Sequence, residues 1–117
     1  MQDATTSTPR RPGTVLVTGF DPFGGSRVNP SYEAVLALDG QEVAGHRIVG
    51  VEIPTVFGLA IERLYEAMDE HQPRLVLVTG QAGGRAALSL ERVAINVNDA
   101  RIPHNAGAKP IDTAGLP

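Results

Sequence analysis

The chain has 117 residues, of which 42% are hydrophobic and 20% charged, and this is the composition of one small globular domain. A net charge of −3 and an aromatic content of 4% argue against a nucleic-acid-binding protein, which would show a basic face and aromatic side chains for base stacking. The chain contains no cysteine, which excludes a disulfide, a thiolate metal site and a nucleophilic thiol within these residues.

The N-terminal segment 1–13 is polar and contains two prolines, without the apolar stretch of a signal peptide. We therefore expect a disordered leader, followed by one α/β domain over residues 14–117. No apolar run approaches the roughly 20 residues that a membrane span requires. These features predict a cytoplasmic protein with no membrane partner.

Three apolar runs predict the strands of a sheet. Thr14–Thr18 is rich in β-branched residues and is followed by Gly19, which is typical of a buried parallel strand. The second run is His46–Ile53, before Pro54. The third is Arg74–Thr79, which again ends at a glycine.

Two helices are predicted between these strands. The first covers about Ser31–Leu38, with Asn29 as its cap, Pro30 at its first position and Gly40 past its end. The second covers about Val56–His71. Its apolar residues recur at helical spacing and form one stripe: Phe57, Ile61, Leu64 and Met68.

Alternation of strand and helix predicts an α/β fold with a parallel sheet. Right-handed crossovers would place the glycine-bearing loops after Thr18 and Thr79 at the carboxyl edge of that sheet, where open α/β sheets bind ligands. Three strands and two helices are half of a doubly wound sheet, and we expect its second face to lie uncovered. The chain is therefore interpreted as the N-terminal part of a larger fold.

Residues 87–98 show a strand-like pattern that changes phase at Glu91-Arg92. Leu88 and Leu90 are apolar at even positions, whereas the apolar residues after the change stand at odd ones. Two interpretations stay open: one strand with a bulge that re-aims a side chain, or a turn between two short strands. From Arg101 to Pro117 the sequence predicts a polar loop.

The first glycine loop admits more than one interpretation. Gly19 to Ser26 has the spacing of a phosphate-binding loop, but Gly25 stands where the lysine is needed, so nucleotide binding is the weakest hypothesis. Phe20 and Phe23 either pack in the core or form the wall of a small apolar pocket, and their place in a glycine-rich loop favours the pocket.

The second glycine loop, Gly80–Arg85, is either a ligand-binding loop or a plain turn, and the residues leave the two even. Glu91 is either part of an exposed ion pair with Arg92 or a carboxylate that orients a histidine. Arg101 either holds an anionic or carbonyl group or stabilises its loop. The carboxylates and the three histidines do not fall at metal-ligand spacings, which predicts no metal site.

Together these segments resemble the pyroglutamyl-peptidase I (pyrrolidone-carboxylate peptidase) family. Each motif alone is weak, but six in order are specific: V-T-G-F-D-P-F-G-G, N-P-S, P-T-V-F, G-Q-A-G-G-R, E-R-V-A-I-N and D-A-R-I-P. The resemblance runs from about Val15 to Asn105. It implies the N-terminal part of a three-layer α/β/α sandwich around a twisted, mostly parallel sheet.

The resemblance also implies a chemistry: removal of N-terminal pyroglutamate (5-oxoproline) from peptides by a Cys-His-Glu triad, without metal or cofactor. It implies that Glu91 is the triad carboxylate and that Phe20 and Phe23 sandwich the pyrrolidone ring. Gln81 would line the site, and Arg101 would lie near the catalytic thiol. Family members often form dimers or tetramers, so a homo-oligomer is a further implication.

The sequence departs from the family in length. Family members are roughly twice as long, and their catalytic cysteine and histidine lie in a C-terminal half that has no counterpart here. His104 stands where the family has aspartate, but no nucleophile remains for it to activate. We therefore expect no turnover from these residues alone. The alternative hypothesis is a short, non-catalytic module that binds lactams or a partner protein.

Overall fold

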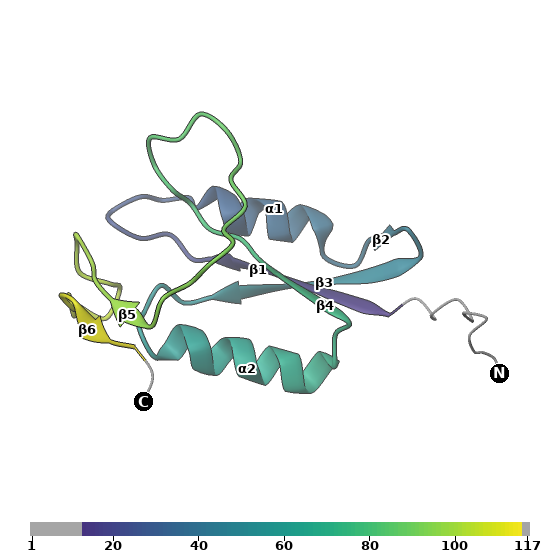
Figure 1. Ribbon diagram of the computed structural model, residues 1–117. Helices are drawn as coiled ribbons and strands as arrows, with labels where there is room; N and C mark the ends of the chain where they lie inside the picture. The colour runs from purple at the N-terminus through teal and green to yellow at the C-terminus, as the bar shows by residue number, and fades with distance from the viewer. Residues whose placement is uncertain (1–12, 116–117) are drawn as a thin grey trace.

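The computed structural model describes residues 13–115, and Figure 1 shows the path of the chain. The predicted leader therefore lies, except for Gly13, outside the described residues. The elements in chain order are β1 (Thr14–Phe20), α1 (Pro30–Leu38), β2 (Glu42–Val43), β3 (His46–Ile53), α2 (Leu59–His71), β4 (Leu75–Val78), β5 (Val97–Asn98) and β6 (Thr113–Ala114).

The main sheet has the strand order β2-β3-β1-β4. β1 lies in the middle and pairs in parallel with β3 on one side and β4 on the other, which confirms the predicted α/β fold with a mostly parallel sheet. β2 is a short antiparallel addition to β3 that the sequence analysis missed. The available signal was Ala44-Gly45, whose positive φ values of 52° and 79° make the tight turn of a hairpin.

The two helices cover opposite faces of the sheet (Figure 1), so the expectation of an uncovered second face was wrong. The chain crosses from β1 outward to β3 and then back past β1 to β4. Right-handed crossovers in opposite directions must place their helices on opposite faces. α1 packs on a cluster around Val17, Val35 and Ile48, and α2 packs on a cluster around Leu16 and Ala67.

The start of α1 is fixed by its predicted cap. The side chain of Asn29 accepts hydrogen bonds from Ser31 N at 3.0 Å and from Ser31 Oγ at 2.7 Å. The same Ser31 Oγ accepts from Phe20 N at 2.9 Å, so the cap also ties α1 to the end of β1. Gly40 follows the helix with a φ of 82°, as predicted.

α2 begins three residues later than predicted because Gly58 adopts a φ of 84°, which is incompatible with a helix. The apolar stripe is correspondingly shifted. Ala67 is fully buried and Leu64 packs beside it, whereas Met68 is 37% exposed. Within residues 13–115, no helix is long and apolar enough to cross a membrane.

The prediction of strand structure over residues 87–98 was wrong for all but Val97–Asn98, and both open interpretations fall with it. The preceding residues are irregular and carry fully or largely exposed apolar side chains, among them Leu88, Leu90, Val93 and Ile95. A strand needs a neighbour for its backbone groups, and the described chain offers none there. The predicted C-terminal loop contains one exception, β6, which pairs with β5.

Candidate functional site

A single carboxylate joins three loops at the carboxyl edge of the sheet. Asp21 follows β1, and its Oδ1 accepts from Thr55 Oγ1 at 2.6 Å and from Thr55 N at 2.8 Å, in the loop after β3. The same oxygen accepts from Nδ2 of Asn105 at 3.1 Å, and Asn105 lies 84 positions after Asp21 in the chain. The three loops are thereby held at one place.

Asn105 holds the segment after β5 against the aromatic loop. Its Nδ2 also donates to the Pro22 carbonyl at 3.0 Å, and its backbone N donates to the Thr55 carbonyl at 2.9 Å. A Cβ added at Gly24 would lie only 3.2 Å from Ile102 Cδ1, so the two segments touch. Arg101, directly before Ile102, is therefore brought to the loop that carries Phe23.

The sequence analysis did not identify Asp21, Thr55 or Asn105 as site residues. Asp21 and Thr55 stand inside the motifs that carry the family resemblance, and Asn105 follows the last motif by two positions, at the end of the matched region; that was the available signal. Their role is long-range, since it depends on which loops meet. No local pattern in the sequence indicates that a carboxylate in one loop will find its donors in two others.

Phe20 is the last residue of β1 and is partly buried. It packs against the core cluster beneath α2, so the core-packing interpretation holds for part of the ring. A Cβ added at Gly80 would lie 3.8 Å from the Phe20 ring, which places the ring beside the second glycine loop. Phe20 thus connects the two glycine loops that the sequence singled out.

Phe23 is partly buried in the loop after β1. Its carbonyl accepts from Ser26 N at 3.1 Å, and Gly24 and Gly25 adopt φ values of 62° and 81° to make the turn. These conformations suit glycine alone without strain. The loop is therefore shaped around Phe23 by residues that a larger side chain would disturb.

The second glycine loop leaves the sheet directly beside β1. Thr79 donates to the Thr18 carbonyl through its N at 2.9 Å and its Oγ1 at 2.7 Å. Gln81 follows within two residues and is exposed. Gly80, directly before Gln81, lies beside the Phe20 ring, so the structure brings the backbone of this loop close to the ring.

Glu91 lies in the irregular segment and is exposed over 74% of its side chain. Its Oε1 pairs with Arg85 Nη1 at 3.2 Å, so the interpretation of a pair with Arg92 was wrong. Arg85 belongs to the second glycine loop, and the ion pair closes that loop onto the Glu91 segment. Among residues 13–115, no recorded hydrogen bond or ion pair joins Glu91 to Asp21 or Arg101.

His104 has a structural role. Its ring lies 5.7 Å from the Phe57 ring, centroid to centroid. Its Nδ1 accepts from Ala106 N at 3.0 Å, which stabilises a tight turn and leaves the ring proton on Nε2. The structure gives His104 a place in loop packing.

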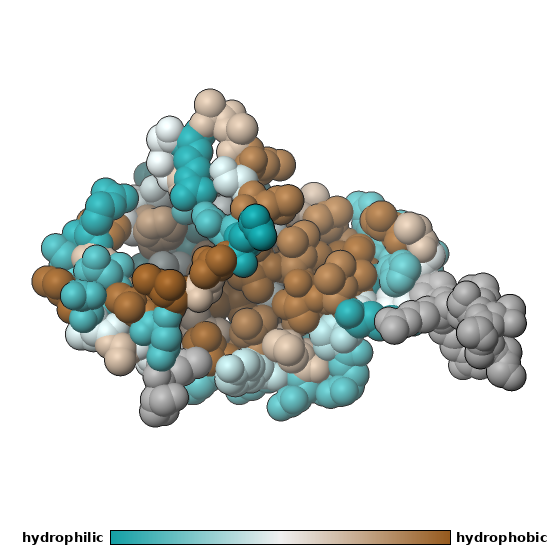
Figure 2. Space-filling model, viewed as in Figure 1, coloured by the Kyte–Doolittle hydropathy of each residue, from teal (hydrophilic) through white to brown (hydrophobic). Residues whose placement is uncertain are grey.

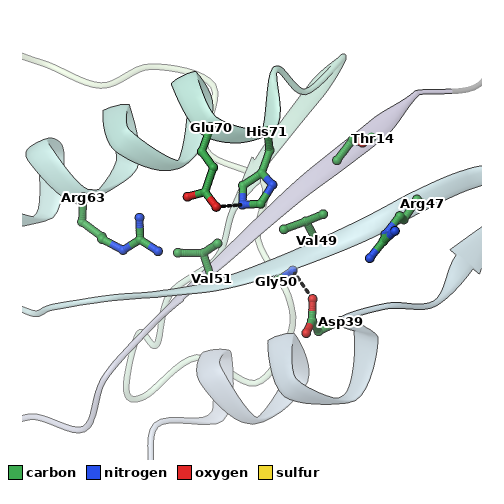
Figure 3. A pocket seen from close by; sticks show the side chains of 9 residues that line it. All are labelled: Thr14, Asp39, Arg47, Val49, Gly50, Val51, Arg63, Glu70 and His71. Carbon is green, nitrogen blue, oxygen red and sulfur yellow. Dashed lines mark hydrogen bonds and ion pairs between the residues drawn. The ribbon is translucent and has the colours of Figure 1, made fainter.

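The cavity shown in Figure 3 lies elsewhere. Its volume is about 520 Å³, and it is bounded by β3, the C-terminal end of α1 and α2. Asp39 accepts from Gly50 N at 2.9 Å on one side, and Glu70 pairs with His71 at 3.7 Å on the other. None of the residues that line it was predicted as a site residue, and it does not reach the loops held by Asp21.

We expect Asp21→Ala to lower the free energy of unfolding by about 2–3 kcal/mol, because hydrogen bonds to a charged group are each worth about 1.5–3 kcal/mol and partly exposed ones less. Urea denaturation followed by circular dichroism measures the change. Asp99→Ala is the matched control, since that exposed carboxylate accepts from Asp112 N at 3.2 Å and so joins residues only 13 positions apart. Equal losses in the two variants would contradict a joining role for Asp21.

Comparison with known proteins gives a consistent result. The family model for pyroglutamyl peptidase matches residues 13–117. Pyrrolidone-carboxylate peptidase of Klebsiella pneumoniae is 57% identical over 85% of this chain and 46% of its own length. The enzyme of the same name from Cupriavidus taiwanensis is 59% identical over 86% of this chain and 47% of its own.

Solved structures agree. Pyroglutamyl peptidase I from Bacillus amyloliquefaciens superposes with a TM-score of 0.86 and 49% identity, over 91% of this chain and 52% of that one. Pyrrolidone carboxyl peptidase from Pyrococcus furiosus gives a TM-score of 0.85 at 43% identity, over 89% and 50%. This chain therefore spans about half the length of the relatives it matches, and corresponds to their N-terminal portion.

Proposed function

Because this chain belongs to the pyroglutamyl peptidase family, we propose that it supplies the substrate wall and the triad carboxylate of a cysteine peptidase that removes N-terminal pyroglutamate from peptides. The observation that supports the proposal is the set of hydrogen bonds made by Asp21 and Asn105. These bonds hold the loops of Phe23, Thr55 and Arg101 together at the carboxyl edge of the sheet. Ligands of open α/β sheets bind at that edge.

The chemistry of the substrate fits these side chains. The lactam ring of pyroglutamate is flat and uncharged, with one N–H and one C=O. The aromatic rings of Phe20 and Phe23 suit its faces, and the exposed amide of Gln81 suits its polar edge. A charged free amino terminus would lose its hydration in such a site without gaining a partner, so it is rejected.

The catalytic part of the proposal concerns Glu91 and Arg101. Glu91 would orient a histidine that draws the proton from a cysteine thiol, and Arg101 would lie near that thiol. Neither cysteine nor a histidine in that role is present in these residues, so we propose that the chain alone turns over no substrate. The proposal places the whole peptidase in the cytoplasm, with pyroglutamyl peptides as substrates and no cofactor.

Binding can be tested on the chain itself. Titration with a pyroglutamyl dipeptide, followed by NMR, should shift amide signals in residues 20–25 and near Arg101. The same dipeptide with a free glutamine at its amino terminus is the control and should shift none of them. Equal responses to both peptides would reject the lactam site. Shifts produced by ATP in residues 19–26 would support the nucleotide-binding alternative instead.

We expect Phe23→Ala to raise KM for pyroglutamyl substrates by about 10-fold, because an aromatic stacking contact contributes about 0.5–1.5 kcal/mol beyond its buried area. Steady-state kinetics of this chain fused to the C-terminal remainder of the Klebsiella pneumoniae relative measures the effect. Phe20→Ala should act in the same direction, with an added loss of stability because Phe20 also packs in the core.

Tyr65→Ala is the control for the aromatic variants. Tyr65 lies on α2 and is 52% exposed, away from the glycine loops, and its removal should leave KM unchanged. An unchanged KM in Phe23→Ala would remove that ring from the substrate site.

A further inference from the structure

The cavity of Figure 3 lies at the β3 side of the sheet, across β1 from β4. Within residues 13–115, β2 pairs only with His46 and Arg47, so the rest of β3 has no strand on its outer side. Figure 2 shows hydrophobic side chains gathered over β4, where Leu75 and Leu77 are exposed. The β3 cavity differs in character, because its walls carry charged and polar side chains.

Two arginines lie at opposite ends of this cavity. Arg47 is the register partner of Thr14, and Arg74 N donates to the Thr14 carbonyl at 2.8 Å just after α2, so the C-terminal end of α2 lies near Arg47. Arg63 stands about two turns earlier in α2 and therefore lies at the other end. Figure 3 shows the same arrangement, with Glu70 between the two arginines.

The charged side chains share the space between β3 and α2. Arg47 and Val51 lie on the same face of β3 because side chains alternate along a strand, and Val51 packs in the cluster beneath α2. On α2, Arg63, Ala67 and Glu70 follow one another at helical spacing, and Ala67 is fully buried in the same cluster. Both arginines and Glu70 therefore line one cavity.

The two guanidinium groups keep hydrogen-bond donors available for a ligand. Arg47 is exposed and has no recorded hydrogen bond or ion pair within residues 13–115. Arg63 pairs with Glu66 at 3.7 Å, which is longer than a hydrogen bond, although only 36% of its side chain is exposed. A guanidinium offers five N–H donors in a planar fork that fits a carboxylate. Each arginine can therefore bind a carboxylate of its own.

Glu70 is the carboxylate that a cationic group of a ligand would meet. Its Oε2 lies 3.7 Å from His71 Nε2, again longer than a hydrogen bond, and 65% of its side chain is exposed. Asp39, on the opposite wall, already accepts from Gly50 N at 2.9 Å. A ligand with negative groups alone would leave Glu70 facing like charge, so the lining favours a ligand that also carries an ammonium group.

We infer that this cavity binds a free acidic α-amino acid. Its two carboxylates would pair with Arg47 and Arg63, its ammonium group with Glu70, and its methylene groups would lie over Val49 and Val51. The volume of about 520 Å³ is in the range of small-molecule sites, which is about 300–1,000 Å³. The inference rests on the cavity alone and is independent of the proposed function.

The test is titration of the chain with L-glutamate, followed by NMR. We expect amide shifts in residues 47–51 and 63–71, away from the segments in which a pyroglutamyl dipeptide is expected to act. L-Glutamine lacks the second carboxylate and glutarate lacks the ammonium group, so each should bind at least about 10-fold more weakly, as expected for loss of a charge-assisted contact. Absence of shifts with glutamate, or equal binding of either analogue, would overturn the inference.

Charge-removing substitutions locate the ligand. Arg47→Gln and Glu70→Gln should each weaken glutamate binding by at least about 10-fold. Arg92→Gln and Glu62→Gln are the matched controls, because both residues are exposed and lie outside the cavity; they should bind within about 2-fold of the unmodified chain. Circular dichroism checks that each variant is folded, and unchanged binding by a folded Arg47→Gln variant would contradict the site.

Two further outcomes are decisive. Glutamate shifts confined to residues 20–25 would assign the ligand to the candidate functional site and overturn the inference. If a variant unfolds, the comparison of glutamate with glutamine and glutarate on the unmodified chain decides. The pyroglutamyl dipeptide is scored separately: a chain that binds glutamate at the β3 cavity but does not respond to the dipeptide rejects the proposed lactam site and leaves this inference standing.

Discussion

Replacement of Gly19 by alanine is expected to lower the free energy of unfolding by about 3 kcal/mol or more. A Cβ at this position would lie 2.5 Å from the Ser31 carbonyl oxygen, 2.6 Å from its carbon and 2.8 Å from Tyr32 N. These are backbone atoms of the first turn of α1, so they cannot rotate away as a side chain would. Overpacking typically costs about 1–3 kcal/mol, and a rigid backbone neighbour puts this site at the upper end.

The effect should extend to the candidate site. Ser31 Oγ accepts from Phe20 N, so moving α1 away from Gly19 also breaks the contact that ends β1. Urea denaturation measures the loss of stability. Gly83→Ala is the matched control, because no heavy atom lies within 4 Å of its added Cβ and its φ is not positive.

Gly83→Ala should change stability by less than about 1 kcal/mol, and in the stabilising direction if at all, since alanine restricts the unfolded chain. A Gly19→Ala variant as stable as Gly83→Ala would show that α1 does not rest on β1 at this point. That result would also remove the physical reason for a glycine between Thr18 and Phe20.

The second large effect is expected from Glu91→Gln, which should lower kcat by about 10³–10⁴-fold with little change in KM. In a triad of nucleophile, base and carboxylate, the carboxylate fixes the tautomer of the imidazole, and its amide analogue lowers kcat by roughly that factor. The measurement requires this chain fused to, or in complex with, a C-terminal half that carries the thiol and the histidine. The substrate is a pyroglutamyl peptide.

Glu66→Gln is a closely matched control. Both carboxylates are exposed, over 71% and 74% of the side chain, and both pair with an arginine, Arg63 in one case and Arg85 in the other. Exposed ion pairs of this kind contribute about 0–1 kcal/mol to stability. Neither variant should therefore unfold the protein, and only Glu91→Gln should lose activity. Comparable kcat values in the two variants would reduce Glu91 to a partner of Arg85.

The ion pair with Arg85 has a consequence for this experiment. In the present structure Glu91 lies in an irregular, exposed segment and faces a cation of its own loop rather than an imidazole. Its orientation toward a histidine would require that segment to be ordered by contacts that residues 13–115 do not supply.

Local sequence patterns predicted a helix or strand correctly where all the residues that determine it lie close together in the chain. Asn29-Pro30-Ser31 specifies a helix start because the cap, the fixed φ of proline and the first turn lie within three residues. The run His46–Ile53 has the predicted bounds because Pro54 ends it and β-branched residues fill it. The alternating pattern that changes phase at Glu91-Arg92, by contrast, predicted strand structure where residues 87–96 are irregular.

The same distinction between local patterns and long-range contacts applies to the candidate site. The motifs pointed to Phe20, Phe23, Gln81, Glu91 and Arg101, and the structure brings the segments of Phe20, Phe23, Gln81 and Arg101 to one edge of the sheet. They did not point to Asp21, whose donors lie 34 and 84 positions away. Nor did they reveal that Glu91 pairs with Arg85, because spacing alone favoured the adjacent Arg92.

By itself, the sequence determined the alternation of strands and helices, the caps and turns that bound them, and the motifs that mark the family, because each depends on neighbours within a few residues. Only the tertiary structure decided that α1 and α2 cover opposite faces, that β1 continues through Gly19 to Phe20, and that residues 87–96 form no strand. Those outcomes depend on partners far along the chain. A strand forms only where another backbone is present to accept its hydrogen bonds.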